Sequence, residues 1–143
     1  MKRKAFLALA LFALMAVGVY AQTETDFDVS KSADGKSVSI TKYNGKATTV
    51  NIPAKIQNLP VTSVRGFKDN TSITSVTIPE SVTEIELGAF QNCTSLTSVT
   101  FGGAKTFFNG SDFPAGIDLA QKYKAGGAGT YTRPRDGKTW TKQ

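Results

Sequence analysis

The side chains that most often carry catalysis are scarce in this sequence. Its 143 residues include no histidine and a single cysteine, Cys93. General bases and metal sites that depend on imidazole are therefore excluded, and a nucleophilic Cys93 or serine would need lysine, aspartate or glutamate as its base. No glycine-rich segment has the spacing and the lysine of a phosphate-binding loop. The composition predicts that the protein is not an enzyme and binds no cofactor.

Two pairs of carboxylates remain as candidates for acid–base chemistry. Glu84 and Glu86 are two residues apart, as are Asp26 and Asp28, so each pair would share one face of an extended chain. Acid–base catalysis would need one member to be desolvated or opposed across a cleft, whereas neighbouring acids on an open strand are usually solvated edge charges. The acidic twelve-residue calcium loop is also absent. We therefore expect no catalytic residue and no metal ligand.

The first 21 residues have the pattern of a secretory signal peptide. Basic residues 2–4 precede an apolar run from Ala5 to Val19, and small residues end the segment at Ala21. The alternative is a membrane anchor, but this run of fifteen residues is shorter than the roughly 20 residues that span a bilayer. We therefore expect an exported chain of residues 22–143 with no integral membrane segment. Loss of three basic residues would reduce the net charge from +6 to +3, which argues against a nucleic-acid partner.

The chain contains an internal repeat. FKDNTSITSVTI at residues 67–78 is nearly repeated by FQNCTSLTSVTF at residues 90–101, and the period is 90 minus 67, or 23 residues. Another step of 23 reaches Phe113. A stretched copy lies upstream, where Val50, Ile52 and Pro53 precede their equivalents by 26 residues. The extra residues of this copy fall at 56–60, which we expect to form a loop.

The apolar residues of each copy follow one spacing. They read Ala47-x-x-Val50-x-Ile52, Ile73-x-x-Val76-x-Ile78 and Leu96-x-x-Val99-x-Phe101. This is the L-x-x-L-x-L spacing of a leucine-rich repeat, whose length is 20–29 residues. One such unit cannot bury its apolar side chains alone, but stacked units place each side chain against its equivalent. The sequence predicts a small leucine-rich-repeat solenoid, mainly β with short helical turns.

The segment VTIPESVTEIELGAFQNCTSLTSVTF, residues 76–101, resembles the repeat of the BspA-like surface proteins. The shared elements are a strand ending in Ile-Pro, a Ser-Val-Thr-x-Ile segment and Ala-Phe-x-Asn-Cys-x-Ser-Leu, and the resemblance covers roughly residues 38–101. It implies a secreted bacterial protein that attaches to host matrix proteins or to other cells. The chain departs from the family where the unit after Phe101 lacks these elements, and it has fewer repeats than members usually carry.

Both ends of the solenoid should be covered by atypical units. We predict an N-terminal capping hairpin at 22–43, with its strands joined at Asp34-Gly35. Repeats then occupy 44–113, and a C-terminal cap at 114–143 contains a short helix and a hairpin. The helix should run from Asp112 to Lys124 and stop at Gly126 and Gly127. Tyr131 and Trp140 flank the second hairpin turn and are interpreted first as lid residues.

The alternation within the repeats places polar side chains outward, in rows across adjacent turns. The residues of this candidate binding face are Thr49, Asn51, Ser75, Thr77, Ser98 and Thr100. Threonine also suits a strand for structural reasons alone, and a polar outer face keeps such a module soluble. As a functional surface, rows of hydroxyls on a rigid sheet would meet a protein or a glycan with little ordering cost.

A weaker candidate patch lies in the basic tail and comprises Tyr131, Arg133, Arg135 and Trp140. It would suit an acidic polysaccharide or an anionic surface. The sequence thus predicts an exported module, extracellular, on the cell surface or periplasmic, that binds macromolecules at a cell or matrix surface. The alternative is a structural or assembly component of the envelope without an external ligand. Self-association through an open end of the solenoid fits either hypothesis.

Overall fold

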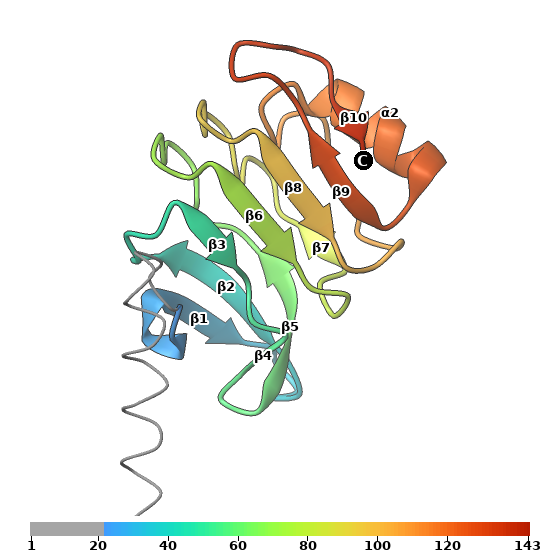
Figure 1. The fold of residues 1–143 in the computed structure, drawn as a ribbon. Helices are drawn as coiled ribbons and strands as arrows, with labels where there is room; N and C mark the ends of the chain where they lie inside the picture. The colour runs from blue at the N-terminus through green and yellow to red at the C-terminus, as the bar shows by residue number, and fades with distance from the viewer. Residues whose placement is uncertain (1–21) are drawn as a thin grey trace, which may run out of the picture.

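The structure, a computed structural model, describes residues 22–143, and the predicted signal peptide at 1–21 lies outside the described residues. Two five-stranded sheets lie one behind the other (Figure 1). The front sheet contains β3 (Thr49–Asn51), β6 (Ser75–Ile78), β8 (Ser98–Phe101), β9 (Gly129–Thr132) and β10 (Thr141–Lys142). The back sheet contains β1 (Phe27–Lys31), β2 (Val38–Tyr43), β4 (Lys55–Ile56), β5 (Leu59–Val64) and β7 (Glu84–Ile85). A short 3₁₀ helix, η1 (Glu24–Asp26), precedes β1, and α2 (Gly116–Gly126) precedes β9.

The front sheet is built from equivalent segments of successive turns. Strands β3, β6 and β8 are parallel and in register, so that Val50 lies beside Val76 and Val76 beside Val99. All three valines are completely buried, while their strand neighbours reach the surface. The prediction that the repeats stack turn upon turn is therefore confirmed. Strand β9 joins β8 in the antiparallel direction, and β10 joins β9 in the same way.

The back sheet begins with the expected N-terminal hairpin. Strands β1 and β2 are antiparallel, and the turn between them includes Gly35 at a positive φ of 70°. Ser32 donates a side-chain hydrogen bond to Asp34 in this turn, at 2.6 Å. Strand β2 then pairs in parallel with β5, and β5 with β7. The hairpin is therefore also the first strand pair of the stacked sheet, and not only a cover over its end.

The stretch at 56–60 is not the loop that we expected. Ile56 pairs with Leu59 in a tight hairpin between β4 and β5. The two linking residues, Gln57 and Asn58, both have positive φ, 53° and 66°, which is the backbone of the two-residue turn that matches strand twist. Pro60 is accommodated inside β5, opposite Lys55 at the start of β4. The extra residues of the stretched copy thus form the turn and the adjoining strand ends of this hairpin.

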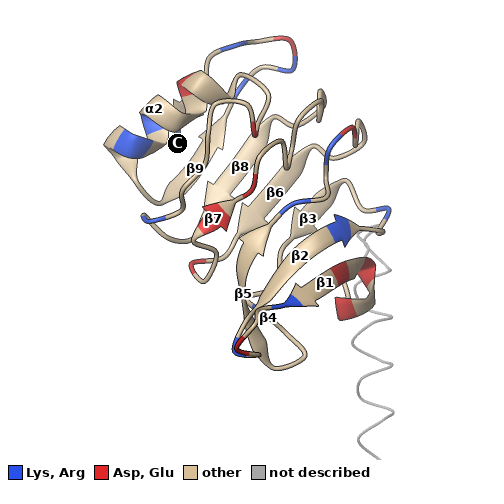
Figure 2. Cartoon of the chain, turned by 180° about the vertical axis from the view of Figure 1, so that it is seen from behind, with Lys and Arg blue, Asp and Glu red and all other residues tan. Residues whose placement is uncertain are grey.

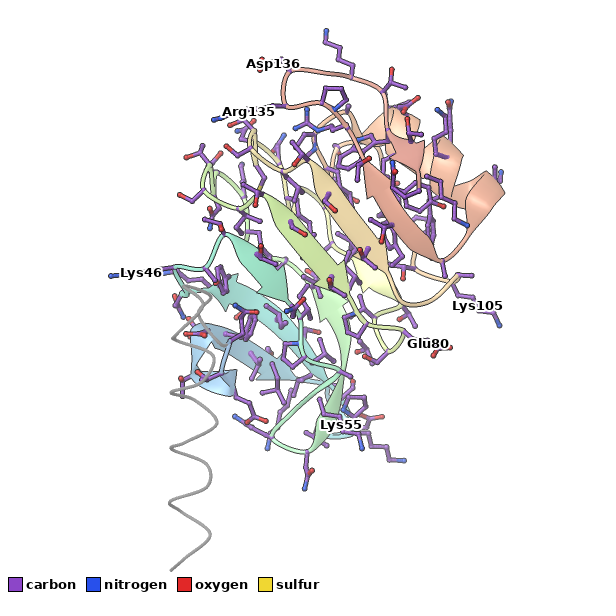
Figure 3. All side chains as sticks on the ribbon, in the orientation of Figure 1. Lys46, Lys55, Glu80, Lys105, Arg135 and Asp136 are labelled. Carbon is purple, nitrogen blue, oxygen red and sulfur yellow. The ribbon has the colours of Figure 1, made fainter. Side chains whose placement is uncertain are left out.

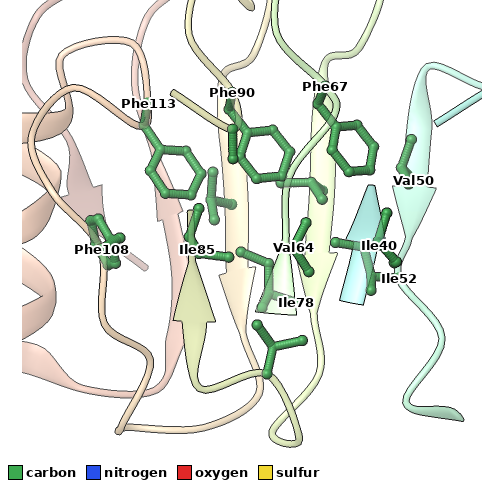
Figure 4. Close-up of a cluster of buried hydrophobic side chains, with 14 of the residues drawn as sticks. Ile40, Val50, Ile52, Val64, Phe67, Ile78, Ile85, Phe90, Phe108 and Phe113 are labelled. Carbon is green, nitrogen blue, oxygen red and sulfur yellow. The ribbon is translucent and has the colours of Figure 1, made fainter. Parts of the chain in front are cut away.

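A column of aromatic rings runs through the core between the two sheets. Its members are Phe27, Tyr43, Phe67, Phe90 and Phe113, with successive ring centroids 5.4, 5.2, 4.7 and 4.8 Å apart. Figure 4 shows the last three in a row beside the aliphatic side chains of both sheets. The recurrence of phenylalanine every 23 residues is therefore a physical stack. Tyr43, which lies one turn earlier, extends the stack although it falls outside the strict period.

The C-terminal cap contains the expected helix and hairpin. Helix α2 starts at Gly116, after the predicted Asp112, because Asp112 is buried in the preceding turn and accepts hydrogen bonds from the backbone of Gly88 and Asn109. The helix ends at Gly126, with Gly127 at a φ of 69°, as the glycine pair predicts. Across the described residues, no helix combines the length and the hydrophobicity needed to cross a membrane.

Candidate binding surface

Two rows of polar side chains cross the front sheet. Register places Thr49, Ser75 and Ser98 in one row, and Asn51, Thr77 and Thr100 in the other. These six side chains are exposed or half-buried, in alternation with buried valines, isoleucines and Phe101. The alignment follows the repeat spacing, while the use of this surface for binding stays a prediction. We call the six residues, with the additions below, the front face.

The front face continues beyond the repeats onto the C-terminal cap. Strand β9 places Thr132 beside Ser98 and Thr130 beside Thr100. The Thr100 and Thr130 hydroxyl oxygens are 2.8 Å apart, within hydrogen-bond distance. Sequence reasoning missed both residues, because the repeat spacing ends before them and does not show which strand a cap hairpin joins. The available signal was the alternation of Thr130, buried Tyr131 and Thr132.

The geometry of the front face is regular and its chemistry is neutral. Adjacent strands in a sheet are about 4.8 Å apart, and side chains on one face of a strand recur after about 6.7 Å. The rows contain only hydroxyl and carboxamide groups. Charged residues that Figure 3 labels, among them Lys46, Lys55, Glu80 and Lys105, lie around the margin of this sheet. A partner would therefore be held by hydrogen bonds and shape more than by charge.

A neighbouring set of threonine hydroxyls makes hydrogen bonds between successive turns of the protein. Thr74 Oγ1 donates to the backbone carbonyl of Thr48 at 3.2 Å, and Thr97 Oγ1 donates to that of Thr74 at 3.4 Å. These bonds tie each turn to the one before it. Repeated threonines thus have two roles in the chain, because those just before the strands join turns while those within the strands form the front face.

The weaker candidate patch is largely internal. Tyr131 and Trp140 are completely buried, and Arg133 is only 8% exposed. The Tyr131 hydroxyl donates to the carbonyl of Gly127 at 2.7 Å, and Trp140 Nε1 donates to that of Pro114 at 3.0 Å. The prediction of an exposed aromatic patch is therefore wrong for these two rings, which pack in the core as lid residues. Of the four residues, only Arg135 is exposed.

The carboxylate pairs show no arrangement for acid–base chemistry. Glu84 is exposed on the back sheet, while Glu86 accepts a hydrogen bond from Ser63 at 2.7 Å and lies 3.6 Å from Arg65. Figure 2 shows the acidic residues spread along the molecule. Within residues 22–143, no three acidic or sulfur-bearing side chains gather as metal ligands would.

Cys93 is a structural residue of a turn. It is completely buried, and its thiol donates a hydrogen bond to the carbonyl of Phe67 at 3.0 Å. The equivalent position in the preceding copy is Asn70, whose side chain accepts hydrogen bonds from the backbone of Ser72 and Ile73. Both side chains therefore pair with backbone groups of the turns, Cys93 with a carbonyl and Asn70 with N–H groups. Burial raises the pKa of the Cys93 thiol from 9.0 to about 11.

At pH 8 we expect native Cys93 to react with a chromogenic disulfide reagent at least about a hundredfold more slowly than the unfolded chain. The thiolate is the nucleophile, and both the raised pKa and the burial of Cys93 suppress it in the folded state. The measurement is the rate of reagent cleavage with and without urea. Equal rates in the two conditions would show that the thiol is accessible and would contradict this packing.

Comparison with known proteins supports the repeat assignment. The model of the BspA type leucine rich repeat region matches residues 40–115, in six copies. The chain belongs to this family. BspA-type leucine-rich repeats are non-enzymatic protein-interaction modules. The match begins within β2, which we predicted to belong to the N-terminal capping hairpin, and it includes β5 in the stretched copy.

Solved leucine-rich-repeat structures resemble this BspA-type protein over part of its length. A leucine rich repeat protein of T. pallidum is 32% identical, with a TM-score of 0.53 over 55% of this chain and 37% of that one. A leucine rich cell surface protein of Faecalibacterium prausnitzii is 37% identical, with a TM-score of 0.50 over 58% of this chain and 23% of that one. A leucine-rich repeat protein of Bacteroides capillosus is 30% identical, with a TM-score of 0.50 over 57% of this chain and 64% of that one. The chain thus covers less than two thirds of each of these proteins. No curated relative matches it.

Proposed function

We propose that the protein is an exported interaction module that binds a protein or glycan at a cell or matrix surface through its front face. The observation that carries this proposal is the continuation of both polar rows from the repeats onto β9. The C-terminal cap therefore extends the front face and does not cover it. One of the similar solved proteins is described as a cell surface protein, which supports a location outside the cell.

The composition of the front face determines how such binding should respond to salt. Its rows are uncharged, and only contacts between charges are strongly screened at moderate ionic strength. Affinity should therefore change by less than about threefold between 50 and 500 mM salt. A steep loss would indicate that the basic residues of the C-terminal tail make the contact.

The direct experiment is a binding assay with the whole protein on immobilised extracellular-matrix proteins and on intact host cells. Adhesion predicts saturable binding to at least one of these surfaces. Protease treatment of intact producing cells should also release the protein, since a surface location exposes it. A protein that is spared by the protease and binds none of the surfaces would instead be a structural or assembly component of the envelope.

A further inference from the structure

A pocket of about 710 Å³ lies at the C-terminal end of the molecule, away from the rows of the front face. It is formed by the first turn of α2 and by the loop that joins β9 to β10. Its wall includes Pro114, Ala115, Ile117 and Asp118 on the helix side, and Arg133, Arg135, Asp136 and Lys138 on the loop side, so that three basic side chains face two acidic ones. The two sides of the pocket differ in chemistry.

Arg133 contributes a buried positive charge to this pocket. Its Nη1 donates to the carbonyls of Arg135 and Gly137, both at 2.9 Å, and its Nη2 donates to that of Thr94 at 3.2 Å. All of these acceptors are neutral. In the described part of the chain no carboxylate lies within ion-pair distance of Arg133, and its Nε has no hydrogen-bond partner.

A buried guanidinium without a counter-ion is energetically unfavourable. Burial accordingly lowers the pKa of Arg133, although Asp136 in the same loop opposes this shift. The ring of Trp140, whose centroid is 5.5 Å from the guanidinium carbon, offers only a cation–π contact. Asp136 is beyond ion-pair distance, so an anion in the pocket would supply the close opposite charge that Arg133 lacks.

The start of α2 adds a second feature that favours an anion. Ala115 is the N-cap residue, in a left-handed conformation, and no side chain caps the helix. The first N–H groups of a helix lack intrahelical partners and carry partial positive charge. In α2 the N–H of Gly116 donates to the carbonyl of Phe113 at 3.0 Å, so the anion would be met by the N–H groups of Ile117 and Asp118. The carboxylate of Asp118, in the same turn, already has other partners. Its Oδ2 accepts a hydrogen bond from the backbone of Trp140, and its Oδ1 lies 3.8 Å from Lys122.

The helix side of the pocket has an apolar part beside Asp118 and Gln121. Ile117 is 70% exposed, and it lies in the first turn of α2 next to half-buried Ala115 in the pocket wall. A ligand that fills the pocket would cover this side chain, which is favourable in proportion to the apolar area removed from water. The ligand should therefore have an apolar body as well as a charge.

We propose that this pocket is a binding site for an organic carboxylate with an apolar skeleton. The carboxylate would face Arg133 and the uncapped start of α2, with Arg135 and Lys138 at the loop side attracting it from solution. The apolar skeleton would lie against Pro114 and Ile117. This site is independent of the front face and does not rest on its proposed role.

Benzoate is a suitable probe, and benzamide is its neutral control of nearly the same shape. In a ¹⁵N–¹H NMR titration of the whole protein, benzoate should cause saturable shifts of the amides of 115–118 and 133–138. Benzamide should bind at least about tenfold more weakly, since a charged hydrogen-bonded group contributes that much. Equal affinity for the two compounds, or shifts confined to other regions, would overturn the proposal.

A pair of surface variants separates the pocket from general effects of charge. Ile117→Glu should raise the Kd for benzoate at least about tenfold, because it removes apolar wall and adds a like charge. Leu87→Glu makes the same change at a side chain that is 79% exposed and outside the pocket, and should leave the Kd within about twofold. Both positions are exposed, so the variants should fold. A similar Kd for the two variants would contradict the site.

Discussion

Phe90→Ala is expected to lower the free energy of unfolding by about 3–5 kcal/mol, the cost of truncating a buried phenylalanine. The ring is completely buried in the middle of the aromatic column, 4.7 Å from Phe67 and 4.8 Å from Phe113. Its removal would leave a cavity that interrupts the contact between successive turns. Because each turn of a solenoid packs only on its neighbours, this cavity cannot be compensated from elsewhere in the core.

Urea denaturation followed by circular dichroism measures this loss. Leu87→Ala is the matched control, because Leu87 lies in the same turn and is 79% exposed; its effect should stay within about 0.5 kcal/mol. A loss below about 1 kcal/mol for Phe90→Ala would contradict the account of the core. It would mean that the stacked rings are not what joins the turns.

The sequence was sufficient to predict the stacked turns because the repeat is itself the core. Two nearly identical segments, 67–78 and 90–101, fix the period, and the alternation around Val76 and Val99 fixes which side chains point inward. Phe113 follows from the same arithmetic, although the rest of its turn has diverged. The front-face positions are then predictable, since they are the outward side chains between buried ones.

Features outside the period could not be predicted in this way. The hairpin between β4 and β5 depends on positive φ at Gln57 and Asn58, and glutamine is not a usual signal for that conformation. The pairing of β9 with β8 joins residues 28 to 34 positions apart, for example Thr100 and Thr130. Local patterns indicate that a strand exists but do not indicate its partner.

The basic tail shows a different limit of sequence reasoning. Arginine and tryptophan near the end of a chain suggest an exposed patch. Trp140 instead closes the core, and Arg133 donates hydrogen bonds to three backbone carbonyls of the adjacent loop and to the carbonyl of Thr94. Burial of these side chains depends on α2 and the β9–β10 loop meeting in three dimensions. The pocket that results has no linear signature in the sequence.

The second large effect is expected for the double variant Thr77→Lys/Thr100→Lys. The two residues are neighbours in one row at the centre of the front face, and a partner seated there would have to desolvate two new charges. Substitutions at the hot spots near the centre of an interface cost about 2 kcal/mol or more, so we expect the Kd to rise at least about 30-fold. Both side chains are half-buried at the surface of the sheet, so circular dichroism should show an unchanged fold.

Thr71→Lys/Gln91→Lys is the matched control for this variant. It adds the same charge at exposed positions in the turns that connect the strands, outside both rows. Its affinity should stay within about twofold of the unmodified protein, since exposed charges away from an interface contribute little at moderate salt. The comparison therefore separates the place of the substitution from the added charge.

The central claim is that stacking of the turns produces the parallel polar rows of the front face and that a macromolecule binds there. The most direct test measures the affinity of the unmodified protein, the Thr77→Lys/Thr100→Lys variant and its control for the same matrix- or cell-surface partner. We predict that only the front-face variant loses binding. Equal affinity of all three proteins would show that the partner contacts another part of the molecule.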